Sequence, residues 1–469
     1  VKRGSAALTL TGANGHTGGT AIENNSGTVV ATVNTTMNSI GRGAAATGAG
    51  SSLVLSNANT SGTTVAIGNA FTGTGTLTLN FAAGLTARNT TMTNVTGFAG
   101  TIRLSNGGAN GDKWNVAGVN AAGAVVEIDS GSQLFPNTAA CTFAGIDAVG
   151  TGNNENRGAI RLTGTLNAPL MLTGDTTIGS EGGTINGNIG SGSPGTQTLT
   201  VGTANSTGNA TFNGAISNGV GAVALTKTQA GALTLGGGSA NTYTGATTLR
   251  QGIIYLNKPD NVAAIAGALV MTDGNQPEIV ALAKNQFAAG ATIDTTGATN
   301  WERVSLMGKD QTLANLTDPA ARMILQNGSL GAGAGPANAA LTVDGAADGY
   351  VSGIIRDNDN GTTAIKLQIV KAGSSTLTFS GANIVYTGNT TVNGGVLKLS
   401  NTTAYASAIV TNNATVRMFA DGNNATLLRT ANGDEQYSVR IKDLIKRGDI
   451  SANVEMKPGD VVIIPQSWF

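Results

Sequence analysis

The sequence is poor in the residues that build disulfide-bonded folds and most nucleophilic sites. It has one cysteine, Cys141, and one histidine, His16, in 469 residues. A single cysteine excludes an intrachain disulfide, and any Ser-His-Asp site would have to use His16. Cys141 stands in the segment NTAACTFAG without a neighbouring base to activate its thiol. We therefore expect a small buried residue there rather than a reactive thiol.

Charged and aromatic residues are also scarce, at 11% and 4% of the chain. The 26 basic side chains balance the 26 acidic ones, so no electrostatic attraction to nucleic acid or to an anionic membrane is expected. The longest apolar run, VAAIAGALVM at 262–271, is far shorter than the roughly 20 residues of a transmembrane helix. Because 40% of the residues are hydrophobic, the chain is nevertheless predicted to fold rather than to stay disordered.

The sequence contains one motif three times, in residues 1–34, 225–258 and 369–401; this repeated motif is called the phrase below. Each copy has a lysine, a glycine, an apolar-Thr-apolar triplet, a Gly/Asn turn, Thr-Gly, a Thr-rich step, another glycine and a second strand pattern. The three lysines are Lys2, Lys227 and Lys371. Such self-similarity predicts units that stack and bury one another's apolar faces. We expect the function to reside in an extended surface rather than in one pocket.

Between the copies, short strand signals recur at regular intervals. SSLVLSN at 51–57, GAIRLTGTL at 158–166 and QTLTVGTAN at 197–205 alternate apolar residues with Thr or Ser between Gly and Asn breaks, as half-buried strands do. Rungs of about 20–25 residues, stacked at about 4.8 Å, would make the first 420 residues a rod on the order of 85 Å long. The predicted core residues are Leu8, Leu10, Leu233, Leu235, Leu377, Phe379, Leu397 and Leu399.

The repeat resembles the autotransporter-associated β-strand repeat of bacterial surface proteins. The elements K-x-G, LTL or LTF, Y-T-G and G-x-L-x-L all appear from Gly231 to Asn257 and again from Gly373 to Ser400. The linking region at 301–316 is similar to the spacer between such repeats. The resemblance implies an all-β fold, a right-handed parallel β-helix (β-solenoid) displayed outside the cell, without implying a ligand. Because the chain begins within a repeat, we expect it to be a segment of a longer exported protein.

The last 39 residues are richer in charged residues than the rest of the chain and differ from it in sequence pattern. Lys446-Arg447-Gly448-Asp449 and Pro458-Gly459-Asp460 through Pro465 resemble the carboxyl end of outer-membrane polysaccharide export proteins. This implies a small mixed α/β tail with a strand, a short helix at KDLIKRGD and a final strand. The predicted division is 1–219 for the first part of the solenoid, 220–430 for the part with two clear copies, and 431–469 for this segment, native or fused.

Three other features of the sequence are weighed as sites. His16 occupies the position that a tyrosine holds in the other two copies, so we expect it to be a repeat residue. The turn Asp357-Asn358-Asp359-Asn360-Gly361 begins like a calcium loop, but its twelfth position is Gln368 instead of Glu. A surface turn is the expectation, with loose Ca²⁺ binding at Asp357 and Asp359 as the alternative. The segment at 107–112 resembles a calcium-binding nonapeptide that would need tandem copies.

Parallel β-helices also serve as polysaccharide lyases and hydrolases, which need carboxylates clustered on neighbouring rungs. The acids between residues 35 and 220 are scattered. Glu127 and Asp129 share a face by the period of two and are the nearest approach to a pair, although solvation of a strand end explains them as well. The acids considered are Asp112, Glu127, Asp129, Asp147 and Glu155. We predict no catalytic, metal or cofactor site, and no enzyme.

The predicted function is that of a non-catalytic, extracellular structural or adhesive protein of a bacterial surface, as a rod or self-assembling fibre or coat. The alternatives are a polysaccharide-binding or polysaccharide-degrading β-helix and, more weakly, a component of polysaccharide export. The expected partners are further copies of the chain, head to tail or lateral, and a surface polysaccharide, with no nucleic acid and no transmembrane segment. The apolar VVIIP and Trp468-Phe469 of the tail would cover the last rung or pair with a neighbour's first rung, an inert tail being the alternative.

Overall fold

The structure is a computed structural model that describes most of the chain. The described residues are 1–33, 38–57, 64–81, 89–106, 113–272, 275–330, 333–358, 364–400, 405–407, 409–418, 425–429, 435–441, 443, 451, 454 and 460–463. Every element whose bounds are given below is a β-strand. No helix in these ranges has the length and apolar character needed to cross a membrane.

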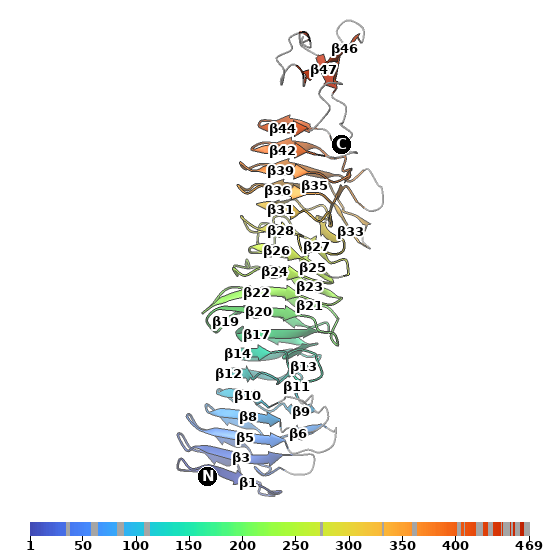
Figure 1. Ribbon diagram of the computed structural model, residues 1–469. Coiled ribbons are helices and arrows are strands. Elements are labelled where there is room, and N and C mark those ends of the chain that lie inside the picture. Colours follow the sequence, from blue (N-terminus) through green and yellow to red (C-terminus); the bar gives the residue numbers. More distant parts are fainter. Residues whose placement is uncertain are drawn as a thin grey trace.

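The strands coil into a long rod, with each turn stacked on the one before it (Figure 1). Parallel pairing joins strands one turn apart, so that Leu53 lies opposite Leu77 and Leu225 opposite Thr247. The predicted parallel β-solenoid is thus confirmed. The first ladder described below has 18 strands, one from each turn, and therefore 17 steps of about 4.8 Å, so the stack is about 80 Å long. This length agrees with the roughly 85 Å expected from the sequence.

Three sets of strands form the sides of the solenoid. The first ladder runs along the whole rod: β1 (Leu8–Leu10), β3 (Thr28–Val33), β5 (Ser52–Asn57), β8 (Thr76–Phe81), β10 (Thr101–Ser105), β12 (Asn120–Ile128), β14 (Cys141–Gly150), β17 (Leu170–Ser180), β20 (Thr196–Val201), β22 (Ala222–Lys227), β24 (Thr247–Leu249), β26 (Ala268–Met271), β28 (Thr292–Asp294), β31 (Asn315–Asp318), β36 (Gly349–Val351), β39 (Thr376–Phe379), β42 (Val396–Leu399) and β44 (Thr415–Met418).

The second side is made of two ladders that meet the long strands β14 and β17. One is β6 (Val65–Ile67), β9 (Asn89–Met92), β11 (Lys113–Val116), β13 (Leu134–Pro136) and β15 (Ile160–Leu162). The other is β16 (Thr165–Asn167), β18 (Thr184–Ile185), β21 (Ala210–Phe212), β23 (Ala232–Leu235), β25 (Ile253–Leu256), β27 (Glu278–Ala281), β29 (Glu302–Ser305), β32 (Met323–Gln326), β37 (Ile354–Arg356) and β40 (Asn383–Ile384). Short β19 (Ile189–Ser191) pairs with β17.

The third side has strands at both ends of the rod. They are β2 (Thr20–Ile22), β4 (Ala45–Thr47) and β7 (Phe71–Gly73), and then β30 (Gln311–Leu313), β35 (Ala339–Val343), β38 (Leu367–Lys371), β41 (Thr390–Val392) and β43 (Ile409–Asn412). An antiparallel hairpin, β33 (Gly328–Ser329) and β34 (Gly333–Ala334), is inserted in one turn. The backbone N–H of Leu330 donates to the Glu278 carboxylate, which ties this excursion to the outer side of β27.

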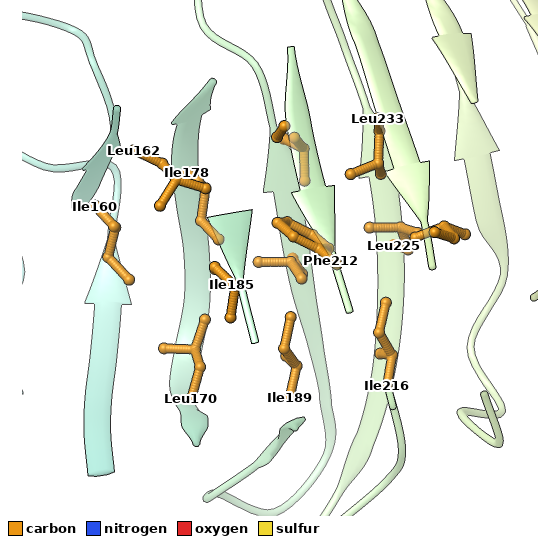
Figure 2. Close-up of a cluster of buried hydrophobic side chains, with 14 of the residues drawn as sticks. Ile160, Leu162, Leu170, Ile178, Ile185, Ile189, Phe212, Ile216, Leu225 and Leu233 are labelled. Atoms are coloured by element: carbon orange, nitrogen blue, oxygen red, sulfur yellow. The ribbon is translucent and has the colours of Figure 1, made fainter. Parts of the chain in front are cut away.

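Side chains alternate along the strands as the period of two predicts. In Figure 2 the labelled Ile, Leu and Phe residues of successive turns point into one shared interior. In β20 and β22 the apolar residues are buried while the intervening Thr and Ala side chains are partly exposed. Each buried Leu or Ile contributes roughly 1.5–3 kcal/mol relative to an exposed one, so the core grows with every turn.

The core prediction is confirmed for six of the eight residues and fails at the first turn. Leu233, Leu235, Leu377, Phe379, Leu397 and Leu399 are buried. Leu10 is only partly buried, and Leu8 is 40% exposed. The reason is that β1 pairs with β3 alone among the described strands, so no described strand covers its other side.

The three copies of the phrase have one layout. The triplet strand and the closing strand of each copy, β1 and β3, β23 and β25, and β39 and β42, lie side by side in parallel. They are therefore successive turns of a coil rather than antiparallel hairpins. The second copy places its triplet strand in the second ladder, whereas the first and third place it in the first ladder.

The tail strands form a separate small sheet. β45 (Ala425–Arg429) pairs antiparallel with both β46 (Glu435–Val439) and β47 (Asp460–Ile463), and Ala425, Leu427 and Val439 form their own apolar cluster. β46 and β47 overlap the two strands expected from the sequence. Of the expected helix at 442–449 only Asp443 lies within the described residues. The resemblance of this segment to export proteins stays a prediction.

Candidate functional site

The lysine of each copy holds a turn together from inside the coil. The Lys227 side chain is fully buried, and its Nζ donates to the carbonyl oxygens of Thr228 and Gln229 at 2.6 and 2.7 Å. It also reaches the carbonyl of Gln251, on the next turn, at 3.5 Å. Burial lowers the pKa of Lys227 to about 8. The ammonium therefore links two successive turns through backbone oxygens.

The other copies repeat this arrangement position by position. Lys371 Nζ donates to the carbonyls of Ala372 and Gly373 and, on the next turn, of Gly394 at 3.4 Å. Lys2 Nζ donates in the same way to Arg3 and, on the next turn, to Ser26 at 2.7 Å.

The glycines of the phrase explain how these carbonyls face the ammonium. Each next-turn acceptor directly precedes a glycine with positive φ, namely Gly27 at 70°, Gly252 at 78° and Gly395 at 63°. Only glycine adopts this conformation without strain. A second glycine with positive φ follows the lysine of each copy, namely Gly4, Gly231 and Gly373. The lysine and these two glycines of each copy form one structural unit, called the lysine device below.

A second repeated device is a buried hydroxyl pair. Tyr243 and Tyr386 are buried, and each hydroxyl lies 2.5 Å from the Oγ1 of the threonine four residues later, Thr247 and Thr390. Burial raises the pKa of Tyr243 to about 12. His16 takes the same place at the exposed first turn, with Nε2 at 3.3 Å from Thr20 Oγ1. This geometry gives His16 the repeat position that the sequence predicted.

The carboxylates considered as a catalytic pair lie in one column of the first ladder. Glu127 has Arg103 opposite it on one neighbouring strand and Asp147 on the other. Asp129 accepts from Arg103 Nε at 2.9 Å. Glu127, Asp129 and Asp147 line a shallow depression of about 210 Å³, and burial raises the pKa of Asp147. The structure thus brings a third acid, Asp147, to the two that share a face in the sequence.

A denser charge cluster lies between β11 and the turn before β18, which the sequence did not reveal. Lys113 pairs with Glu155, and Arg161 lies 3.7 Å from Glu155 and 2.9 Å from Glu181. Arg157 also pairs with Glu181. Burial disfavours the charged form of Glu181, but hydrogen bonds and charge from Arg161 and Arg157 outweigh it and lower its pKa. The carboxylates are used in ion pairs, which points to a structural role.

The suspected calcium turn is occupied by protein donors where it is described. The Asp357 carboxylate accepts from the backbone N–H of Leu367 at 2.8 Å, and from the backbone N–H and hydroxyl of Thr387 at 3.0 and 2.7 Å. Asp359 and the segment at 107–112 lie outside the described residues. Within the parts of the chain that the structure describes, no group of three His, Cys, Asp or Glu side chains is placed to hold a metal ion.

Cys141 faces the interior of β14. Its side chain is fully buried, and burial raises the pKa of its thiol. A buried thiol with a raised pKa is a poor nucleophile, so the geometry favours a packing role.

A depression of about 350 Å³ opens where the turns before β21, β23, β25 and β27 follow one another. Asn209, Gln251, Tyr255 and Asn275 supply its functional groups, and the described residues that line it carry no charge. These residues could not be recognised as a group from the sequence. Gln251 and Tyr255 are close in the sequence, but Asn209 and Asn275 lie 20 or more positions from them.

Comparison with known proteins agrees with the repeat. Residues 1–31, 225–256 and 369–399 match the passenger-associated-transport-repeat family, which confirms the autotransporter-type repeat expected from the sequence. No curated protein and no solved structure matches the chain. A repeat of autotransporter passengers implies a secreted or surface-exposed protein. The chain is therefore a parallel β-solenoid that carries three passenger-associated-transport-repeats.

Proposed function

We propose that the chain is a non-catalytic stretch of a passenger at a bacterial surface, where it forms a stiff rod with a structural or adhesive role. The observation that carries the proposal is the device of Lys227, Gly231 and Gly252, which recurs in all three copies and joins one turn to the next. A chain whose recurrent residues are used for stacking is suited to holding a shape over distance.

The charged groups of the surface support the same proposal. Asp129 is held by Arg103, Glu181 by two arginines and Asp357 by backbone and hydroxyl donors. These contacts fix the side chains and link neighbouring turns, as a structural role requires.

Two measurements test this function. Electron microscopy of the purified chain should show rods about 80 Å long. Antibody raised against the chain should label intact cells that produce the protein, and external protease should remove that label. Labelling that appears only after cell lysis would contradict a surface role, and globular particles would contradict a rod.

A polysaccharide-degrading β-helix is the second candidate, favoured by the column of Glu127, Asp129 and Asp147 in one depression. Incubation of the chain with neutral and acidic polysaccharides, followed by a reducing-end assay, distinguishes the two candidates. Turnover that is lost in Glu127→Gln or Asp147→Asn would establish an enzyme and overturn the first proposal.

Self-association through the ends of the rod is a further part of the proposal. In the described tail, β46 and β47 each pair with β45, while β44 pairs with β42. Deletion of residues 431–469 followed by sedimentation velocity tests the role of the tail. Loss of head-to-tail assemblies would support it, and unchanged assembly would remove the tail from the proposal.

A further inference from the structure

The depression at the turns before β21, β23, β25 and β27 is lined by uncharged described residues. Its functional groups are three carboxamides, Asn209, Gln251 and Asn275, and one phenol ring, Tyr255. Each carboxamide offers one acceptor and two donors. Asn209 uses its Oδ1 to accept from the backbone N–H of Ala232 at 2.8 Å, which leaves its Nδ2 to donate to a ligand.

Tyr255 adds an aromatic ring to the carboxamides of the lining. Its neighbours along β25, Ile254 and Leu256, are buried in the core, so the period of two turns Tyr255 outward. It lies between Thr234 and Val280 of the adjacent strands and is partly exposed. An aromatic ring beside convergent amides suits a ligand with an apolar face and a rim of hydroxyls.

The floor of the depression is held in place by the lysine device. Gly231 and Gly252 line it, and the Lys227 ammonium beneath them binds carbonyls of both turns. A floor fixed in this way loses little conformational freedom when a ligand binds, which favours affinity.

We propose that this depression binds a neutral saccharide chain. Sugar hydroxyls both donate and accept, as the three carboxamides do, and the C–H face of a pyranose matches the ring of Tyr255. The described lining has no cation to pair with a uronate or sulfate group, which favours a neutral chain over an acidic one. The inference rests on the proposed surface role and names the class of partner that such a rod would hold.

The other copies supply a substitution that the fold already accommodates. Val30 and Lys398 occupy the position of Tyr255 in the first and third copies, each three residues after the glycine with positive φ. Tyr255→Val should therefore preserve the turn while removing the ring. Tyr350→Val, at a 39% exposed tyrosine of β36 outside the depression, is the matched control.

Isothermal titration calorimetry of the whole chain with maltohexaose, cellohexaose, N-acetylchitohexaose and hexagalacturonate tests the proposal. We expect at least one neutral hexasaccharide to bind, at least tenfold more weakly to Tyr255→Val and equally well to Tyr350→Val, and hexagalacturonate not to bind. Absence of binding by all three neutral probes, binding unaffected by Tyr255→Val, or preference for the acidic probe would overturn it. Rods in electron micrographs without such binding would leave the structural role intact, which separates the two proposals.

Discussion

The lysine device predicts that one glycine of the repeat cannot be replaced even by alanine. Gly252 has a φ of 78°, and a Cβ added to it would lie 2.3 Å from the Gly231 carbonyl oxygen and 2.7 Å from the Gln229 carbonyl oxygen, which accepts from Lys227 Nζ. Left-handed backbone costs a residue with a Cβ about 1–2 kcal/mol. Displacing a carbonyl from a charged donor costs about 1.5–3 kcal/mol more. Gly252→Ala should therefore lower the free energy of unfolding by about 2.5–5 kcal/mol.

Gly238→Ala is the matched control for this experiment. Gly238 lies in a turn of the same copy without a positive φ, and a Cβ there would meet nothing within 4 Å. Its replacement should change stability by less than about 0.5 kcal/mol.

The loss of stability in Gly252→Ala should be largest in the turns around residue 252, because each turn of a solenoid contacts only its neighbours. Urea unfolding followed by circular dichroism gives the midpoints, and hydrogen exchange of the amides in β23 and β25 locates the loss. Gly395→Ala should reproduce the effect in β39 and β42. Equal midpoints for Gly252→Ala and Gly238→Ala, or unchanged exchange in β23 and β25, would refute the proposed role of the glycine.

Three further outcomes follow from the core and the buried titratable groups. Leu235→Asp should lower the free energy of unfolding by several kcal/mol because it buries an unpaired charge. Leu8→Asp, at a residue that is 40% exposed, should barely shift the urea midpoint. Equal shifts for the two variants would contradict the assigned core. Burial lowers the pKa of Lys227 and of Lys258 from 10.5 to about 8. Between pH 8 and 10.5 the unfolded chain therefore binds more protons than the folded chain. The free energy of unfolding should rise with pH over this range, by on the order of 3 kcal/mol per lysine. Melting temperatures from pH 7.5 to 10 check this, and Lys227→Met should flatten the rise. Above pH 10 stability should fall, because the pKa of Tyr243 is raised to about 12 and the unfolded chain then loses its proton first; Tyr243→Phe should weaken that fall.

The fold could be predicted from the sequence because each level of the pattern pointed to the same structure. The period of two placed Leu233 and Leu235 in the core, and the recurrence of the phrase indicated stacking. The failure at Leu8 has a simple physical cause, since burial in a solenoid requires a turn on each side. The period of two describes a strand but not the neighbours that cover it.

The site could be predicted only in part, because its geometry depends on register. Glu127 and Asp129 were visible as a pair along one strand, but Asp147 joins them only because β12 and β14 pair with Glu127 opposite Asp147. Likewise Arg161 reaches Glu181 across a turn. Turn lengths vary along the rod, so the sequence does not state which residues of neighbouring turns face each other.

The copies themselves separate structural residues from those with individual roles. Where all three agree, as at Lys227 and Gly252, the residues build contacts that every turn of this kind requires, and recurrence alone could have revealed them. Where they differ, the fold tolerates several residues, as Val30, Tyr255 and Lys398 show at one outward position. A residue at such a position is free of the demands of stacking, so its chemistry is available for contacts with other molecules. In a solenoid built from repeats, specific binding is therefore to be sought where the copies diverge, and the depression around Tyr255 lies at such a position.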